Sequence, residues 1–112
     1  MFHFVDGLRF SWRGYVAAFK HAEAFRQELI VFVIAAVAAV FLGDNAIERA
    51  ILIGVLFPIL VTELVNTAIE TVVDRIGTEH HELSGRAKDL ASAAVFTCII
   101  AAVVVWVIVL IG

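Results

Sequence analysis

The sequence predicts an all-α membrane protein in which an N-terminal amphipathic surface helix precedes three transmembrane helices. Three observations support this fold class. Hydrophobic residues make up 62% of the 112-residue chain, and the mean hydropathy of +1.01 lies far above that of soluble proteins. Long uncharged stretches alternate with short polar segments, and polar residues inside the second stretch recur at helical spacing. We therefore expect one membrane-embedded domain, 1–112. Its net charge of −3 argues against nucleic acid as a partner.

Residues 2–21 are expected to form the surface helix. Apolar and charged side chains lie on opposite faces: Phe4, Leu8, Trp12, Tyr15 and Phe19 against Asp6, Arg9, Arg13 and Lys20. Such a helix lies in the headgroup layer, with its aromatic face toward the acyl chains and its basic face toward anionic lipid. A soluble helix packed on a core is the alternative, but nothing else in the sequence resembles a soluble core.

The first transmembrane span is predicted at about 25–42. Its uncharged run, 29–42, covers only about 21 Å as a helix, which is less than the roughly 30 Å hydrocarbon layer. The helix must therefore begin earlier, near Phe25. A Gly-Asp-Asn turn at 43–45 ends it.

The second span is predicted at 46–75. Asp44 or Asn45 can cap its first turn, because both residue types accept hydrogen bonds from the free N–H groups there. Pro58 lies inside this span and removes one backbone donor, which predicts a kink or a local widening near Gly54.

The third span is predicted at 87–111, after a polar connecting segment at 79–89. Residues 90–112 are uncharged for 23 positions, enough to cross the membrane once. Seven of the eight basic residues fall before the first span or in the second loop. The positive-inside rule therefore places the N-terminus and the second loop in the cytoplasm and the C-terminus outside.

The second span carries a polar stripe that its membrane position does not explain. Glu63, Asn66, Glu70 and Asp74 are spaced so that they share one helix face about 80° wide and roughly 16 Å long. An acidic side chain at the bilayer centre costs on the order of 2.5–3.5 kcal/mol. Buried carboxylates of this kind indicate a functional site that opens toward the cytoplasm.

The chemistry that fits this stripe is phosphoryl transfer with Mg²⁺ and a nucleotide. The acidic residues at the cytoplasmic end are Glu70, Asp74, Glu79 and Asp89. Carboxylates suit Mg²⁺, which binds through one or two of them together with nucleotide phosphates. Lys88, assisted by Arg86, can contact the phosphates. Glu63 lies about 10 Å deeper than Glu70, where it can accept the proton of a lipid hydroxyl. No glycine-rich phosphate loop is present.

Each residue also has a structural interpretation. Glu63 alone would serve as a helix-packing hydrogen bonder or a proton relay, and Asn66 as a contact between helices. Adjacent histidines such as His80 and His81 are usually solvated, and Trp106 fits an interfacial aromatic belt. A proton- or cation-coupled transporter is a second functional hypothesis, because intramembrane carboxylates also mark ion paths. A trimeric scaffold is a third.

Two motifs are specific enough to identify a family resemblance. Glu63-x-x-Asn66-Thr-Ala-Ile-Glu70-x-x-Val-Asp74-Arg-Ile-Gly is followed by Glu79-x-His81-Glu-Leu-Ser-Gly-Arg-Ala-Lys88-Asp89. Together with Phe25-Arg26-Gln27-Glu28 and Ser11-Trp12, they resemble the small bacterial integral-membrane diacylglycerol kinases over nearly the whole chain. The related undecaprenol kinases share the central motif and are the alternative within the family.

The resemblance implies a homotrimer in the bacterial inner membrane that transfers the γ-phosphate of MgATP to diacylglycerol and gives phosphatidic acid. It implies Glu63 as the general base, with Asn66 beside the reacting centre. The nucleotide positions it implies are Phe10, Glu70, Asp74, Glu79, His80, His81, Lys88 and Asp89. The lipid positions are Trp12, Arg26, Glu28, Glu63, Ser92 and Trp106.

Two departures from the family pattern concern the metal and the nucleotide. The family places a metal-binding Glu three residues before Phe25, where this chain has Ala22 followed by Glu23. Glu70 and Glu23 are the expected metal ligands, but one step along a helix turns a side chain by about 100°. Either Glu23 reaches the ion after local adjustment, or the second ligand is absent and MgATP binding is weakened. Phe10 stands where the family usually has Tyr, which keeps a stacking surface but loses a hydroxyl.

Overall fold

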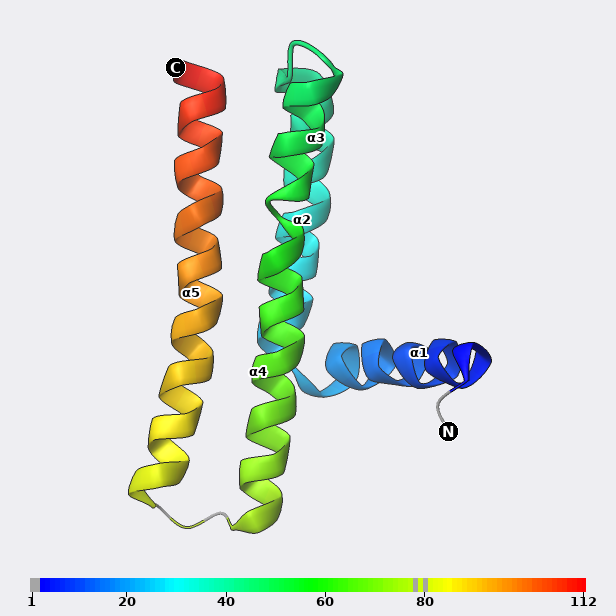
Figure 1. The fold of residues 1–112 in the computed structure, drawn as a ribbon, viewed down its shortest axis with the longest axis vertical. Coiled ribbons are helices and arrows are strands. Elements are labelled where there is room, and N and C mark those ends of the chain that lie inside the picture. The colour runs from blue at the N-terminus through cyan, green and yellow to red at the C-terminus, as the bar shows by residue number, and fades with distance from the viewer. Residues whose placement is uncertain (1–2, 78, 80) are drawn as a thin grey trace.

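A computed structural model describes residues 3–77, 79 and 81–112. Its helices, in chain order, are α1 (Phe4–His21), α2 (Glu23–Leu42), α3 (Ala46–Gly54), α4 (Phe57–Ile76) and α5 (Glu82–Ile111). In Figure 1, α2, α5 and the α3–α4 pair run side by side along the long axis, whereas α1 projects sideways from them. The α2–α3 turn and the C-terminus lie at one end of the bundle, and the α4–α5 connection lies at the other.

Three helical stretches in the described residues are long and apolar enough to cross a membrane: Glu23–Leu42, Ala46–Ile76 and Glu82–Ile111. Large apolar side chains point outward along them, as Ile34 and Phe41 do, while several of the buried residues are alanines. Small residues where helices meet and apolar residues outside are the arrangement expected when lipid replaces water. The three predicted spans are confirmed as helices, with different boundaries.

The first two helices meet at Ala22 without a linker. Ala22 has an extended backbone (φ −111°, ψ 100°), so α1 ends at His21 and α2 begins at Glu23. The predicted surface helix at 2–21 starts at Phe4, because His3 before it has an extended backbone; residue 2 lies outside the described residues. The first span begins two residues before the expected Phe25.

The α2–α3 turn is held by a reciprocal cap. The Asn45 side-chain oxygen accepts a hydrogen bond from the Glu48 N–H at 2.9 Å, and the Glu48 carboxylate accepts from the Asp44 N–H at 3.0 Å. Together these bonds satisfy two N–H groups that a helix start leaves free. Of the two predicted caps, Asn45 is the one used. Arg49 also donates from Nε to the Val40 carbonyl at the end of α2.

The predicted kink in the second span occurs as a break between α3 and α4. Pro58 has no N–H, and upstream of it the Leu56 N–H bonds to the Ile53 carbonyl at 3.0 Å, one residue closer than in an α-helix. The Leu52 carbonyl thereby loses its helical partner. It accepts instead from Trp106 Nε1 of α5 at 3.0 Å. A hydrogen bond between helices therefore replaces the backbone bond that the Leu52 carbonyl loses at the break.

The third span begins earlier than predicted. We expected a connecting loop at 79–89 and a helix from 87, but α5 starts at Glu82. His81 caps it, because its Nδ1 accepts from the Leu83 N–H at 3.1 Å. Lys88 and Asp89 therefore lie on a helix rather than in a loop.

Candidate functional site

The polar stripe predicted on α4 is a hydrogen-bonded row. Asn66 Nδ2 donates to Glu63 Oε2 at 3.2 Å and to Glu70 Oε1 at 2.9 Å. Glu63 and Asn66 are 4% and 8% exposed, whereas Glu70, one turn further along, is exposed. One amide thus orients a buried carboxylate and an accessible one. The predicted common face of these three residues is confirmed.

Thr67 adds a contact that the sequence analysis missed. Its hydroxyl donates to the Glu63 backbone carbonyl at 2.9 Å and lies 3.4 Å from Glu63 Oε2. Threonine inside a helix commonly bonds the carbonyl four residues earlier, so the spacing from Glu63 to Thr67 was an available signal. The contact places a second polar group against the buried carboxylate.

Half-buried Glu28 of α2 adds a second carboxyl group beside the buried part of the row. Its carboxyl lies beside that of Glu63, close enough for the two groups to interact directly. Glu28 Oε2 and Asn66 Oδ1 are both buried acceptors without a hydrogen-bond partner among the described residues. Two carboxylates side by side repel each other, and buried acceptors without donors are costly. The cluster is thus rich in acceptors and complementary to a molecule that brings a donor.

The exposed end of the row meets α5. Lys88 Nζ forms an ion pair with Asp74 Oδ1 at 2.8 Å, and both side chains are about half exposed. A small cavity of about 230 Å³ lies here. Among its lining residues are Asp74, Gly77, Glu79, His81 and Lys88. The structure therefore brings together four of the predicted nucleotide residues.

Three other predicted nucleotide residues, Glu70, Asp89 and Phe10, do not line this cavity, and His80 cannot be placed. Asp89 lines a separate shallow groove on α5 with Glu82 and Arg86. Phe10 lies exposed on α1, with the guanidinium carbons of Arg9 and Arg13 at 6.0 and 5.9 Å from its ring centre. His80 falls outside the described residues. The roles of all four stay predictions.

The two predicted metal ligands, Glu70 and Glu23, lie on different helices, α4 and α2. Glu70 is exposed, and one of its carboxylate oxygens accepts a hydrogen bond from Asn66. Glu23 is exposed at the start of α2, where its carboxylate accepts a hydrogen bond from Gln27 Nε2 at 3.4 Å. Across residues 3–77, 79 and 81–112, no three Asp, Glu, His or Cys side chains converge as a metal site. The donor chemistry of Glu70 fits a divalent cation that keeps water and phosphate ligands, since such ions need only one or two carboxylates.

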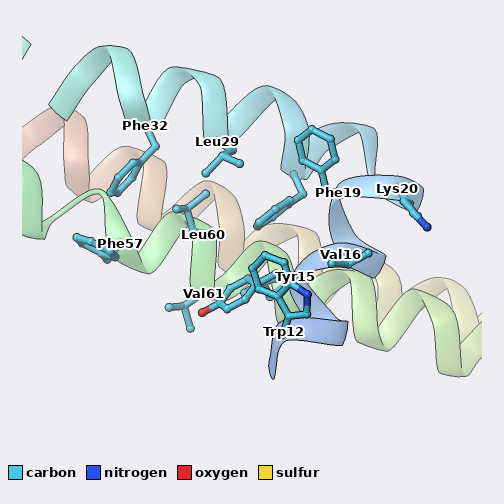
Figure 2. Close-up of a pocket in the computed structure, with 12 residues that line it drawn as sticks. Trp12, Tyr15, Val16, Phe19, Lys20, Leu29, Phe32, Phe57, Leu60 and Val61 are labelled. Carbon is cyan, nitrogen blue, oxygen red and sulfur yellow. The ribbon is translucent and has the colours of Figure 1, made fainter. Parts of the chain in front are cut away.

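The predicted lipid residue Trp12 lines a large apolar cavity between α1, α2 and α4. The cavity has a volume of about 610 Å³. Figure 2 shows its walls: α1 contributes Trp12, Tyr15, Val16, Phe19 and Lys20, α2 contributes Leu29 and Phe32, and α4 contributes Phe57, Leu60 and Val61. Phe32 and Phe57 meet edge to face, with ring centres 4.8 Å apart. This composition suits hydrocarbon chains rather than a nucleotide.

The polar groups of two other predicted lipid residues are bonded to backbone. Arg26 Nη1 donates to the Phe19 and Lys20 carbonyls at 2.8 and 3.2 Å, and Trp106 bonds the Leu52 carbonyl, as described above. Ser92 lies half-buried on α5. Backbone bonding gives Arg26 and Trp106 a structural role that the sequence did not indicate.

Comparison with known proteins identifies the family. The family model described as prokaryotic diacylglycerol kinase matches residues 9–110. The chain belongs to this family. Among curated relatives, the diacylglycerol kinase of Escherichia coli (strain K12) is 50% identical over 90% of this chain and 83% of its own length. The diacylglycerol kinases of Haemophilus influenzae and Pseudomonas aeruginosa are 44% and 41% identical, over 93% and 92% of this chain and 88% and 84% of their own lengths.

Membership of the diacylglycerol kinase family confirms the resemblance drawn from the two motifs. Kinases of this family are phosphotransferases with an alcohol acceptor, so the chain is an enzyme. With three apolar helices, it is a bacterial membrane protein. The kinase family favours phosphoryl transfer over the transporter and scaffold hypotheses for the buried carboxylates.

Trp106→Phe tests the structural role of the indole. Phe keeps the aromatic bulk but cannot donate to the Leu52 carbonyl, so the free energy of unfolding should fall by about 1 kcal/mol, typical of a hydrogen bond between membrane helices. Reversible unfolding in mixed detergent micelles measures this change, with Val107→Ala, which shortens an exposed neighbour, as the control. Unchanged stability together with a raised KM for lipid would instead make Trp106 a substrate-binding residue.

Proposed function

We propose that this family member transfers the γ-phosphate of MgATP to the hydroxyl of diacylglycerol and gives phosphatidic acid. The observation that carries the proposal is the Asn66 bridge between buried Glu63 and exposed Glu70. The Asn66 amide links the buried carboxylate, proposed to bind the lipid hydroxyl, to the exposed carboxylate, proposed to face the nucleotide. The names of the relatives support diacylglycerol as the acceptor.

The buried end of the row is suited to the acceptor alcohol. Glu28 Oε2 and Asn66 Oδ1 have no donor in the part of the chain that the structure describes, and a hydroxyl O–H would supply one. Glu63 accepts this proton as the hydroxyl oxygen forms its bond to the γ-phosphorus and the bond to the ADP oxygen breaks. The proton thus ends on the Glu63 carboxylate and the negative charge leaves with ADP. Asn66 and Thr67 hold the carboxylate in place, which limits the reorganisation that the step requires.

The apolar cavity under α1 is suited to an acyl chain. Its lining is almost entirely hydrocarbon and aromatic, and it includes Leu64, the neighbour of Glu63 on α4. A chain bound there would hold a glycerol hydroxyl near the buried carboxylates. This arrangement explains why the cavity and the polar row occur on the same segment of α4.

The exposed end of the row is suited to the nucleotide and its cation. A divalent ion bound with the nucleotide would neutralise phosphate charge, and we propose Mg²⁺ for this role. Glu70 would contribute a carboxylate oxygen, and Glu23 is the candidate for a second. Lys88, held by Asp74, and the side chains of Glu79 and His81 line the adjoining cavity, where they would orient the phosphates. Phe10, His80 and Asp89 are further candidates for nucleotide contacts.

We also propose an orientation and an assembly. Figure 1 shows the end of α4 and the start of α5 extending beyond the level of α1. If α1 lies in the headgroup layer of the inner membrane, the Asp74–Lys88 pair lies in the cytoplasm, in agreement with the positions of the basic residues. For the assembly we propose the homotrimer with shared sites that the family resemblance implies, and the exposed apolar side chains leave helix faces for neighbouring protomers as well as for lipid.

A phosphorylation assay on the purified protein tests the proposal. Diacylglycerol and undecaprenol are offered side by side with [γ-³²P]ATP, with and without Mg²⁺. We expect label in phosphatidic acid that requires Mg²⁺. Label only in undecaprenyl phosphate would overturn the choice of substrate, and ATP hydrolysis without any labelled lipid would overturn the kinase mechanism.

A further inference from the structure

The junction between α1 and α2 depends on one side chain. The last carbonyls of a helix lack N–H partners, and at the end of α1 the carbonyls of Phe19 and Lys20 are such groups. Arg26, which lies one turn into α2, donates to both from Nη1, at 2.8 and 3.2 Å. A positive charge at this end of α1 is also favoured by the helix dipole. The guanidinium therefore fastens the second helix to the end of the first.

This contact matters because little else holds α1 in place. Ala18 is the only buried residue of α1, and the aromatic residues of that helix are mostly exposed. Ala22, with its extended backbone, is the single residue between the two helices. The Arg26 bonds to the C-terminal carbonyls of α1 are therefore among the few contacts that fix the angle between α1 and the bundle.

The same angle determines the shape of the apolar cavity. Figure 2 shows Trp12 and Tyr15 of α1 together along one wall of the cavity, with Phe19 and Lys20 farther from Phe32 and Phe57. Trp12 lies about two helical turns from the carbonyls that Arg26 binds, so a small rotation at Ala22 becomes a larger displacement at Trp12. Releasing the end of α1 would move this wall of the cavity while leaving the α4 row in place.

We propose that Arg26 is a positioning residue that locks the α1–α2 junction and thereby sets the width of the cavity for the acyl chains of the lipid substrate. This inference rests on the proposed lipid kinase function for the identity of the ligand. It assigns to Arg26 an action through α1 rather than direct contact with the reacting groups. The residue affects lipid binding and leaves the chemistry at Glu63 unchanged.

The first test measures the position of α1 directly. Spin labels at Val5 of α1 and Val33 of α2, both exposed, report the distance between the two helices in a Cys98→Ala background, with labelled protein diluted into unlabelled protein. We expect a narrow distance distribution with Arg26, a broad one with Arg26→Ala, and partial narrowing with Arg26→Lys, whose single ammonium can reach one carbonyl. This measurement needs no substrate, so it remains informative if the proposed function fails.

The second test separates lipid binding from chemistry. For Arg26→Ala we expect KM for a long-chain diacylglycerol to rise about tenfold, with kcat at saturating lipid and KM for MgATP changed less than about twofold. A dihexanoyl substrate, which fills less of the cavity, should be affected less. Arg49→Gln is the matched control, because it removes an arginine bond to a helix-end carbonyl at the opposite end of the molecule.

Two outcomes would overturn the inference. An unchanged distance distribution in Arg26→Ala would show that the guanidinium does not hold α1. A loss of kcat with an unchanged distribution would make Arg26 a residue that touches the reacting groups. If no lipid is phosphorylated even by the unmodified protein, the proposed function fails, and the spin-label result alone still decides whether Arg26 locks the junction.

Discussion

Replacing Glu63 with Gln is expected to lower the rate of phosphate transfer by about 10²–10⁴-fold, the contribution typical of a positioned general base. Gln cannot accept the hydroxyl proton. It keeps the shape of Glu and an oxygen that can accept from Asn66 Nδ2, so the row on α4 should stay folded. Labelled phosphatidic acid formed from [γ-³²P]ATP measures the rate, and circular dichroism checks the helix content.

A matched control separates this effect from general loss of a carboxylate. Glu48→Gln removes a charge at the α2–α3 turn, at the opposite end of α3–α4, and should leave phosphate transfer almost unchanged. Turnover retained by Glu63→Gln would remove Glu63 from the role of base and would point to Glu28, which lies beside it.

For Glu70 we expect a change in the requirement for metal. Glu70→Gln retains an acceptor for Asn66 Nδ2 but loses the charge, so the concentration of Mg²⁺ needed for half-maximal rate should rise about tenfold or more. Glu70→Ala also removes the hydrogen-bond partner of Asn66, which frees the amide that orients Glu63. It should therefore lower kcat as well. Titration of Mg²⁺ at fixed ATP measures both effects, and an unchanged requirement in Glu70→Gln would contradict the metal role.

Much of the α4 row could be predicted from the sequence, because a single helix has a fixed period. The spacing of Glu63, Asn66 and Glu70 determines that they share a face, whatever surrounds them. The break near Pro58 and the cap at Asn45 were predictable for the same reason. Both depend on backbone chemistry within one turn of the chain.

Contacts between helices could not be predicted in this way. The contact between Glu28 and Glu63 joins residues 35 positions apart, and the bond from Trp106 to the Leu52 carbonyl joins residues 54 positions apart. No local sequence pattern specifies either contact. The start of α5 was missed for a different reason. The polar residues at 79–89 resemble a loop in composition, but the His81 side chain caps a helix within that segment.

The row on α4 divides the proposed reaction between a buried end for the alcohol and an exposed end for the nucleotide. Equilibrium binding of MgATP to Glu63→Gln and Glu70→Gln separates the two ends. We expect Glu63→Gln to bind the nucleotide as well as the unmodified protein does, despite its low rate of transfer, and Glu70→Gln to bind it at least tenfold more weakly, about 1.4 kcal/mol. Equal weakening in both variants, or weakening in Glu63→Gln alone, would contradict this division.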